Sequence, residues 1–414
     1  ASLSSNDCLE IWPVELPQHC QWKRLDRSGP WQEFASACGD EKLGFASRVE
    51  NFGPTEVVAV DWHGVLAWEA LRLLPSRQGQ PPCNAKICYY NFRIYSSSCY
   101  EHSNSSKCNE KASEQSDDQF YREKEQLCCR QANVIICLSQ HDKSMIQRLI
   151  ENDNGTNHEP IERKTKHIHI IYPPLRGDIW ELASRISIYS EFLPPEIKVA
   201  MERSSLKTYK QRAFITCMVR LSPEKSPHLF ITLLQKLGGV DFLKRHSLIP
   251  VMCGARSVEE YAEKVVEDFR SLCSPDNDGD EGETWPHVII NRHLGPNELA
   301  AVFSRTAVNV HPCLYDAYGM TLVESAAFGA PTIVNNGGKV GAVSLLGEGK
   351  GCMAVDLEKM LLTSDDSELP REVKSLESYT TLRQIAKEAR SRALGWDEMA
   401  CCQGFINALN GMSN

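Results

Sequence analysis

Two acidic residues stand eight positions apart in a segment that joins an apolar strand pattern to a helix pattern. The segment is YDAYGMTLVE, residues 315–324, and the acids are Asp316 and Glu324. Gly319 permits a sharp turn and a close approach of the backbone to a ligand. The amides that follow it open a helix, and the N-terminal end of a helix attracts phosphate. Glu324, one turn into the helix, can accept hydrogen bonds from ribose hydroxyls.

The alternative interpretation of this pair is a solvated aspartate in a loop and an exposed glutamate on a helix. The neighbours of Glu324 argue against it, because they are apolar: Leu322, Val323, Ala326, Ala327 and Phe328. An ionised carboxylate in apolar surroundings needs a partner. The pattern therefore favours a binding role for Glu324.

Two cations follow an earlier strand pattern, in the segment VRLSPEKS, residues 219–226. Arg220 leaves the end of the strand, and Lys225 begins the next helix pattern. Ligands of open α/β sheets bind at such carboxyl ends. Arginine offers a fork of donors and lysine a compact charge, so the two suit a diphosphate. The alternative is a pair of surface cations, with Lys225 paired to Glu224.

Strand and helix patterns alternate along the chain in two series. The first has strands at 56–61, 86–91, 133–138 and 167–172, helices at 65–74, 123–132 and 142–152, and a polar loop at 99–122. The second has strands at 214–219, 248–253, 288–291, 307–311 and 332–335, and helices at 226–237, 258–273, 297–304 and 320–328. This alternation predicts an α/β protein with parallel sheets. We expect two doubly wound, Rossmann-like domains, residues 1–205 and 206–395, and a helix in 396–414 that packs back on the first domain.

Together the motifs resemble those of the retaining glycosyltransferases of family 4 (glycosyl transferases group 1), which share the GT-B fold with starch and sucrose synthases. That family has an Arg-Leu-x-Pro-Glu-Lys stretch, met by residues 220–225, and an E-x7-E motif, met by Asp316 and Glu324. A Gly-Gly turn after the next strand is met by Gly337-Gly338. The resemblance is good from about 212 to 355 and weaker from 56 to 172. It implies two domains that face a cleft.

The resemblance also implies roles for individual residues. Arg220 and Lys225 would hold the diphosphate, Asp316 would contact the donor sugar, and Glu324 the ribose. The backbone amides expected to meet the phosphate or sugar are those of Gly319, Met320 and Thr321.

Two further positions follow from the resemblance. Leu294, next to His293, stands where backbone groups of the family meet the base. Asp61-Trp62-His63 resembles the His-Asp-Trp region of starch synthases, so His63 is expected to touch substrate. The alternative for His63 is a structural histidine.

The sequence departs from the family in several places. Asp316 is one methylene shorter than the usual glutamate, and Gly341 stands where many members carry glutamate. Tyr90-Asn91 replaces a frequent His-Asn pair. The usual N-terminal strand with its glycine-rich loop is not visible before residue 56. Either the chain is truncated, or the segment from Cys8 to Val14 is a divergent first strand.

Composition excludes some partners. The net charge of −9, from 45 basic and 54 acidic residues, argues against nucleic acid. No window holds 18 apolar residues, so no transmembrane segment is expected. Seventeen cysteines, several of them in apolar runs and none with zinc-ligand spacing, favour a reducing, cytoplasmic location and no metal site. Two N-x-Ser/Thr triplets, at Asn104 and Asn154, keep a secretory location open.

We therefore predict a retaining hexosyltransferase that moves a sugar from a nucleoside diphosphate sugar to a hydroxyl acceptor. No cofactor is expected, because the nucleotide sugar is a substrate and the two cations take the role of a metal. The alternative is a non-catalytic nucleotide-sugar-binding or regulatory module of the same fold, which the shorter acid Asp316 favours. An epimerase of related fold would not need both motif pairs.

Overall fold

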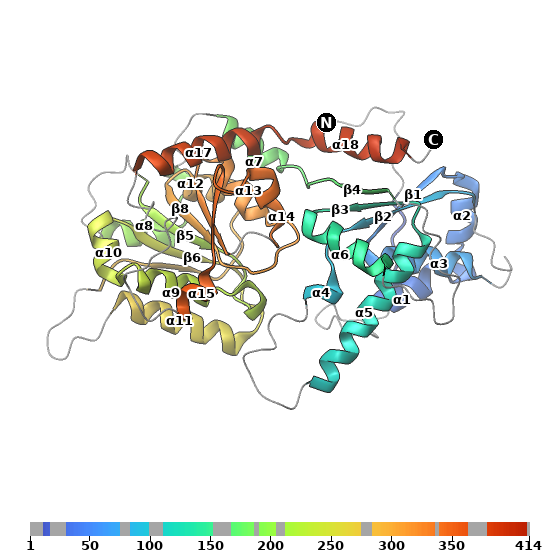
Figure 1. Cartoon of the computed structure of the whole chain (residues 1–414), viewed down its shortest axis with the longest axis horizontal. Coiled ribbons are helices and arrows are strands. Elements are labelled where there is room, and N and C mark those ends of the chain that lie inside the picture. The colour runs from blue at the N-terminus through green and yellow to red at the C-terminus, as the bar shows by residue number, and fades with distance from the viewer. Residues whose placement is uncertain are drawn as a thin grey trace. The chain divides into compact units, whose positions relative to one another are not determined.

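The computed structural model describes residues 11–16, 30–74, 83–98, 111–151, 167–185, 190–203, 212–274, 284–335, 339–362 and 379–411. The chain divides into two compact units, each with its own sheet (Figure 1). Unit 1 comprises residues 1–137, 145–169 and 407–414, and unit 2 comprises 138–144 and 170–406. Residues 170–205, placed in the first domain by the sequence patterns, thus lie in unit 2.

Unit 2 is built on a six-stranded sheet in the order β10-β9-β8-β5-β6-β7, and its paired strands are parallel. The strands are β5 (Phe214–Met218), β6 (Ile249–Cys253), β7 (Val288–Ile290), β8 (Thr306–His311), β9 (Thr332–Asn335) and β10 (Cys352–Val355). The direction of winding reverses between β5 and β8. In doubly wound sheets the ligand binds beside this switch point, outside the carboxyl ends of the strands.

Helices cover both faces of this sheet (Figure 1). One group consists of α9 (His228–Lys236), α10 (Gly239–His246), α11 (Glu259–Cys273) and α15 (Leu357–Leu362), which contact one another. The other consists of α7 (Gly177–Ser184), α12 (Pro296–Phe303), α13 (Met320–Ala327), α14 (Gly341–Leu346) and α17 (Tyr379–Leu394). Two further elements are η3 (Ser190–Phe192) and α8 (Pro195–Arg203). Because both faces are covered, β5 and β6 are buried along their whole length.

A buried polar network ties α13 to the sheet. Asn309, on β8, accepts a hydrogen bond from Thr216 of β5 at 2.9 Å. Its amide nitrogen lies 3.4 Å from the Ser325 hydroxyl on α13 and 3.3 Å from the Thr332 hydroxyl on β9. Ser325 and Thr332 are themselves 2.9 Å apart. Buried polar groups stay paired in this way, and the network fixes α13 relative to three strands.

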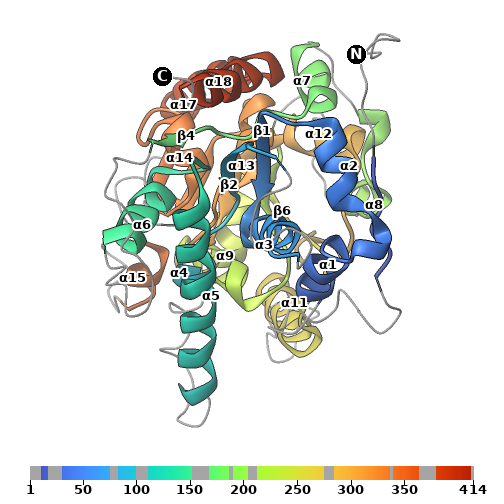
Figure 2. The same ribbon diagram turned by 90° about the vertical axis from the view of Figure 1, so that its right-hand side faces the viewer.

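Unit 1 contains a four-stranded sheet in the order β1-β2-β3-β4, with β1–β2 and β2–β3 parallel. Its strands are β1 (Glu56–Val60), β2 (Lys86–Asn91), β3 (Val134–Cys137) and β4 (His167–Ile170). Its helices include α1 (Pro30–Cys38), η1 (Glu41–Leu43), α2 (Phe45–Phe52), α3 (Asp61–Arg72), α4 (Tyr95–Ser98) and α5 (Lys111–Gln131). Helices α3 and α5 pack against each other and against β2 (Figure 2). Two helices have residues in both units: α6 (Gln140–Glu151) and α18 (Glu398–Asn410).

Several expectations were wrong or incomplete. Residues 111–122, predicted as loop, form the first half of α5. This polar sequence has no apolar residues at regular helical spacing, but its Ala, Glu, Gln, Lys and Arg residues all favour helix. Residues 11–16 form no strand. The patterns also missed β10 and, among the described helices, α1, α2, α4, α7, α8, α10, α14, α15 and α17. The Gly337-Gly338 turn and the triplets at Asn104 and Asn154 lie outside the described residues.

Candidate functional site

Lys225 and Asp316 form an ion pair at the switch point of unit 2. After β5 the chain enters the short helix η4 (Pro223–Lys225), and after β8 a loop leads to α13. The Lys225 Nζ atom lies 2.8 Å from Asp316 Oδ2, with side-chain exposures of 18% and 21%. Burial lowers the pKa of Lys225, but Asp316 outweighs it, so that the pKa is raised. Burial would raise the pKa of Asp316, but His311 and Lys225 hold it well below its usual range.

His311, the last residue of β8, is a third member of this cluster that the sequence patterns did not single out. Its imidazole is 2% exposed, and its Nε2 atom lies 3.4 Å from the same Asp316 Oδ2 atom. Burial lowers the pKa of His311, but Cys313 and the Asp316 carboxylate outweigh it and raise it to about 9. A histidine that ends a central strand, five residues before a motif acid, is the signal that could have found it.

The backbone of the 313–319 loop is fixed by the segment before α14. The Asp316 amide donates to the Lys339 carbonyl at 3.1 Å, and the Gly341 amide donates to the Asp316 carbonyl at 3.1 Å. A Cβ atom on Gly341 would lie 2.1 Å from the carbonyl oxygen of Ala317. The position where many family members carry glutamate therefore has no room for a side chain here.

Helix α13 begins at a glycine in the left-handed region. Gly319 has φ +85°, and a Cβ atom there would lie 3.0 Å from Leu322 Cδ1. Two of the residues whose amides were expected to meet a ligand, Met320 and Thr321, form the first turn and are half-buried. The helix thus presents its N-terminal end, which favours an anion, directly after the loop that carries Asp316.

Glu324 is buried within α13 at 4% exposure. Burial raises its pKa, and Arg176 opposes the shift. The Arg176 Nη1 atom lies 3.7 Å from Glu324 Oε1, and Asp178 holds the same guanidinium at 2.7 Å. Arg176 precedes α7, a helix absent from the sequence prediction, so this partner could not be found from a motif. Since 3.7 Å is long for a hydrogen bond, the carboxylate keeps capacity to accept further bonds.

Arg220 and Leu294 are near the same edge of the sheet but in separate surroundings. Arg220 is 48% exposed and pairs with Glu224, not with Asp316, in the described chain. Its backbone is confined, because a Cβ atom on Gly254 would lie 1.8 Å from the Val219 carbonyl oxygen. Leu294 is half-buried just before α12. The structure thus brings Lys225 and Asp316 together and leaves Arg220 and Leu294 outside their pair.

The donor atoms of His311, Cys313 and Asp316 lie within 4.8 Å of one another, a set that could hold a metal ion. The Lys225 ammonium already lies on the carboxylate oxygen that such an ion would use. A metal at this place would have to displace it against charge repulsion.

Comparisons with known proteins bear on this arrangement. Residues 199–358 match the family Glycosyl transferases group 1. No curated protein sequence matches the chain. A UDP-forming alpha,alpha-trehalose-phosphate synthase from Burkholderia xenovorans, in complex with glucose-6-phosphate, is similar in structure. Its TM-score is 0.62 at 12% identity, covering 93% of this chain and 78% of that one.

Two other solved structures are similar to a comparable degree. A trehalose-6-phosphate structure from E. coli, bound with UDP-2-fluoro glucose, has a TM-score of 0.63 at 14% identity, covering 92% of this chain and 78% of that one. The N-terminal domain of the Candida albicans trehalose-6-phosphate phosphatase has a TM-score of 0.58 at 13% identity, covering 93% and 75%. The chain thus carries a glycosyl transferases group 1 domain and has the GT-B fold of these structures.

Outside the matched residues, His63 lies in unit 1 on α3. Its ring stacks on Trp31, with centroids 3.9 Å apart. Burial lowers the pKa of His63 to about 4, so the imidazole is neutral at pH 7. These contacts suit a structural histidine, and the substrate contact remains a prediction. Neighbouring Asp61 accepts a hydrogen bond from the Phe92 amide at 2.7 Å, which joins the end of β1 to the segment after β2.

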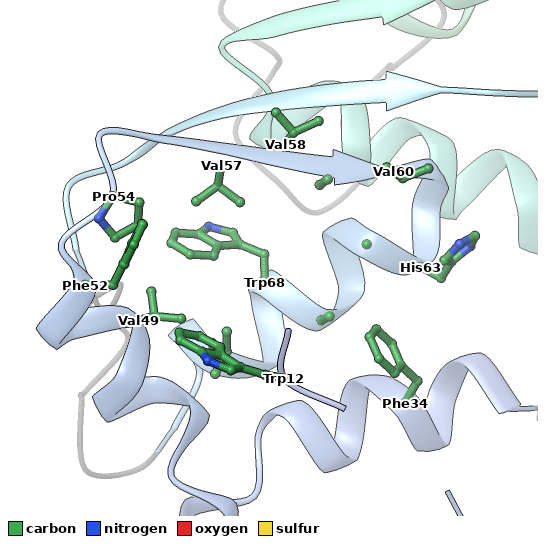
Figure 3. A pocket seen from close by; sticks show the side chains of 14 residues that line it. Trp12, Phe34, Val49, Phe52, Pro54, Val57, Val58, Val60, His63 and Trp68 are labelled. Atoms are coloured by element: carbon green, nitrogen blue, oxygen red, sulfur yellow. The ribbon is translucent and has the colours of Figure 1, made fainter. Parts of the chain in front are cut away.

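An apolar cavity of about 610 Å³ lies beside His63 (Figure 3). Trp12, Phe34, Val57 and Trp68 line it, between β1 and helices α1, α2 and α3. A charged diphosphate would find no cation among its lining residues. The cavity therefore does not suit a diphosphate, whereas the Lys225–Asp316 pair of unit 2 offers a cation. Among the described residues, no helix is both long and apolar enough to cross a membrane.

Proposed function

We propose that the glycosyltransferase moves a sugar from a UDP-sugar to a hydroxyl acceptor with retention of the anomeric configuration. The observation that carries the proposal is the Lys225–Asp316 pair at the β5–β8 switch point, directly before α13 with its buried Glu324. A cation, a helix N-terminus and a buried acid in this order fit a phosphate group followed by a ribose.

Each part of the donor molecule has its own binding residues in this proposal. Lys225 and Arg220 hold the diphosphate, and Glu324 accepts hydrogen bonds from the ribose hydroxyls. Asp316 contacts the transferred sugar. The backbone groups completing the site are the amides of Gly319, Met320 and Thr321 at the phosphate or sugar, and those near Leu294 at the base.

The chemistry of this site is stabilisation of the departing diphosphate. Developing negative charge on the leaving group is met by fixed cations and helix-terminal amides, which need no rearrangement during the reaction. Lys225 supplies the positive charge that a divalent ion supplies elsewhere, so transfer needs neither metal nor cofactor. Because the site offers stabilisation of the leaving diphosphate, the proposed course is departure of the diphosphate and attack of the acceptor on the same face of the sugar.

UDP is the nucleotide that the comparisons favour. One similar structure is bound with UDP-2-fluoro glucose, and another is a UDP-forming synthase. The carboxylate of Glu324 suits a ribose whatever the base. We therefore assign UDP as the nucleotide, and leave the acceptor as a hydroxyl compound.

A non-catalytic nucleotide-binding module is the second candidate. The ion pair favours it, because Asp316 already has two partners, Lys225 and His311, in the absence of a donor. The two candidates differ in turnover. A catalytic site releases UDP from a UDP-sugar when an acceptor or water attacks, whereas a binding module returns the donor unchanged.

The test combines binding and turnover. A thermal-shift panel of UDP, GDP, ADP, UDP-glucose and UDP-galactose should show stabilisation by the uridine nucleotides, since ligands that bind the native state raise its melting temperature. Release of UDP during incubation with UDP-glucose would establish turnover. Stabilisation without UDP release would favour the binding module, and a panel in which no nucleotide shifts the melting temperature would overturn the proposal.

We also infer that the glycosyltransferase works in a reducing compartment such as the cytoplasm. None of the cysteines among the described residues forms a disulfide, and most are buried. Burial raises the pKa of Cys253 and Cys273 to about 12, which keeps both thiols unreactive. Titration of the denatured, unreduced protein with a thiol reagent should find all 17 cysteines free. A smaller number would indicate disulfides and a secretory location.

A further inference from the structure

Asp316 Oδ2 is faced by two donors that come from different elements. Lys225, from η4, reaches it at 2.8 Å and remains 18% exposed. His311, from β8, lies at 3.4 Å and is 2% exposed. One donor thus belongs to the interior of the unit and the other to its accessible edge. Either can balance the carboxylate charge, and the shorter of the two contacts is that of Lys225.

The imidazole of His311 is incompletely satisfied. Neither ring nitrogen has a hydrogen bond of ordinary length within the described residues, although both atoms are buried. Buried polar groups in native proteins are nearly always paired, so an imidazole without an ordinary hydrogen bond calls for an explanation, such as a role in the site. Asp316 Oδ2 lies 3.4 Å from Nε2, so a small movement of this carboxylate would complete the bond.

The loop leaves little freedom for any other movement. Asp316 is held by backbone hydrogen bonds to Lys339 and Gly341 on both its amide and its carbonyl. A Cβ atom on Gly319 would lie 3.7 Å from His311 Nε2, which places the imidazole under the start of α13. The backbone is therefore fixed while the side chain of Asp316 can turn between Lys225 and His311.

We propose that His311 is a positioning residue. When a diphosphate binds Lys225 and breaks its ion pair with Asp316, His311 becomes the hydrogen-bond donor to Asp316. The inference rests on the proposed function, because it requires a diphosphate at Lys225. The free protein keeps Lys225 and Asp316 neutralised by each other. As the diphosphate binds, the ammonium turns to phosphate oxygens, and His311 donates from Nε2 to Asp316 Oδ2. Asp316 stays ionised and fixed, with Oδ1 available to the donor sugar.

The titratable groups around His311 fit this exchange. They are Asp316 and Cys313 on the loop, and Lys225 on η4 through its contact with Asp316. When Lys225 leaves, the carboxylate loses one cation, and its attraction to a protonated imidazole rises. No proton has to cross between protein and solvent during the exchange.

A double-mutant cycle on UDP affinity tests the proposal by calorimetry. His311→Phe keeps a ring of similar size and removes the donor, so Lys225 remains bound to Asp316. UDP affinity should fall about tenfold, which corresponds to about 1.4 kcal/mol. In an Asp316→Asn background Lys225 has no carboxylate to leave, and His311→Phe should then change UDP affinity less than twofold. A merely structural histidine would lower affinity by the same factor in both backgrounds, which would overturn the proposal.

A second measurement uses the parent protein. It therefore tests the proposal even if the His311→Phe variant fails to fold. Nitrogen-15 spectra of the histidine rings should show the His311 resonances shifting as UDP saturates, while those of His287 stay in place. If UDP binds and the His311 resonances do not shift, the proposed change of the Asp316 partner from Lys225 to His311 is wrong, while the proposed function is unaffected. If the parent protein does not bind UDP at all, the proposed function is wrong, and so is the proposed change of partner at Asp316.

Discussion

Lys225 and Asp316 stand 91 residues apart in the chain, yet their charged groups meet at 2.8 Å. The pair exists because β5 and β8 are neighbours in the sheet, so the segments that follow them emerge side by side. Each residue lies only a few positions beyond the end of its strand. The separation in sequence and the contact in space are both consequences of one doubly wound topology.

Lys225→Ala should weaken UDP binding by about 10- to 100-fold, because a charge-assisted hydrogen bond contributes roughly 1.5–3 kcal/mol. Calorimetry with UDP measures the effect. Lys264→Ala, on the exposed side of α11, is the matched control and should bind UDP like the parent. Equal affinity of the Lys225 and Lys264 variants would remove the phosphate assignment.

Glu324→Gln should make the free protein more stable and the nucleotide complex weaker. Burial raises the pKa of Glu324, so the ionised carboxylate opposes folding at pH 7, and a neutral amide of equal size relieves this cost. The melting temperature without ligand should rise by a few degrees, while UDP produces a smaller shift than in the parent. A variant that is less stable, and binds UDP normally, would show that the carboxylate is structural.

The free energy of unfolding should fall as the pH is raised from about 6.5 to 9. His311 has its pKa raised from 6.5 to about 9 in the folded protein, so its contribution is complete below pH 6.5 and is lost as the pH passes through 9. The loss is on the order of 3 kcal/mol. Urea unfolding at several pH values measures it, and His311→Gln should flatten the dependence. A parallel decline in the variant would assign the effect to another group.

Gly254→Ala should destabilise the glycosyltransferase by more than about 3 kcal/mol, because the new methyl group would lie 1.8 Å from the Val219 carbonyl oxygen. The displaced backbone carries Arg220, so the refolded fraction should also bind UDP less tightly. Gly404→Ala is the control, since a Cβ atom there lies 3.9 Å from its nearest neighbour and the helix gains an alanine. Its melting temperature should be equal or higher.

Transfer should retain the donor configuration and continue in EDTA. Lys225 and Arg220 supply the positive charge that the leaving diphosphate requires, so chelation removes nothing from the site. Proton NMR of the first sugar product from UDP-glucose, before mutarotation, reports the anomer. An inverted product, or activity restored only by added divalent ions, would contradict the mechanism.

The sequence patterns located the elements around the candidate site better than the residues that contact Asp316 and Glu324. The strand Thr332–Asn335 and the start of α13 at Met320 were predicted at their observed positions, since apolar runs and a glycine mark them. Arg176 was out of reach, because a lone arginine before an unrecognised helix carries no motif. His311 was also out of reach, because its place in the candidate site depends on which strand lies beside β8.

In unit 1 the strands were predicted close to their observed positions, but local patterns were less informative about two other features. Residues 111–122 were read as loop from their charge, although helix propensity does not require an apolar face when a helix is largely solvated. His63 was judged by its neighbours in sequence, but its nearest ring is Trp31, on a helix that the patterns did not find. Local patterns report burial well, and they report tertiary partners only when a motif encodes them.

The strand order of unit 2 also determines when, during synthesis of the chain, the proposed nucleotide site can form. The β5 side of the site is made early, whereas the β8 side emerges from the ribosome 91 residues later. Only a chain that has inserted β8 beside β5 can bind a nucleotide, because the cation and the acid come from opposite sides of this late junction. UDP would therefore act as a folding ligand, drawing incompletely assembled chains toward the native sheet by mass action.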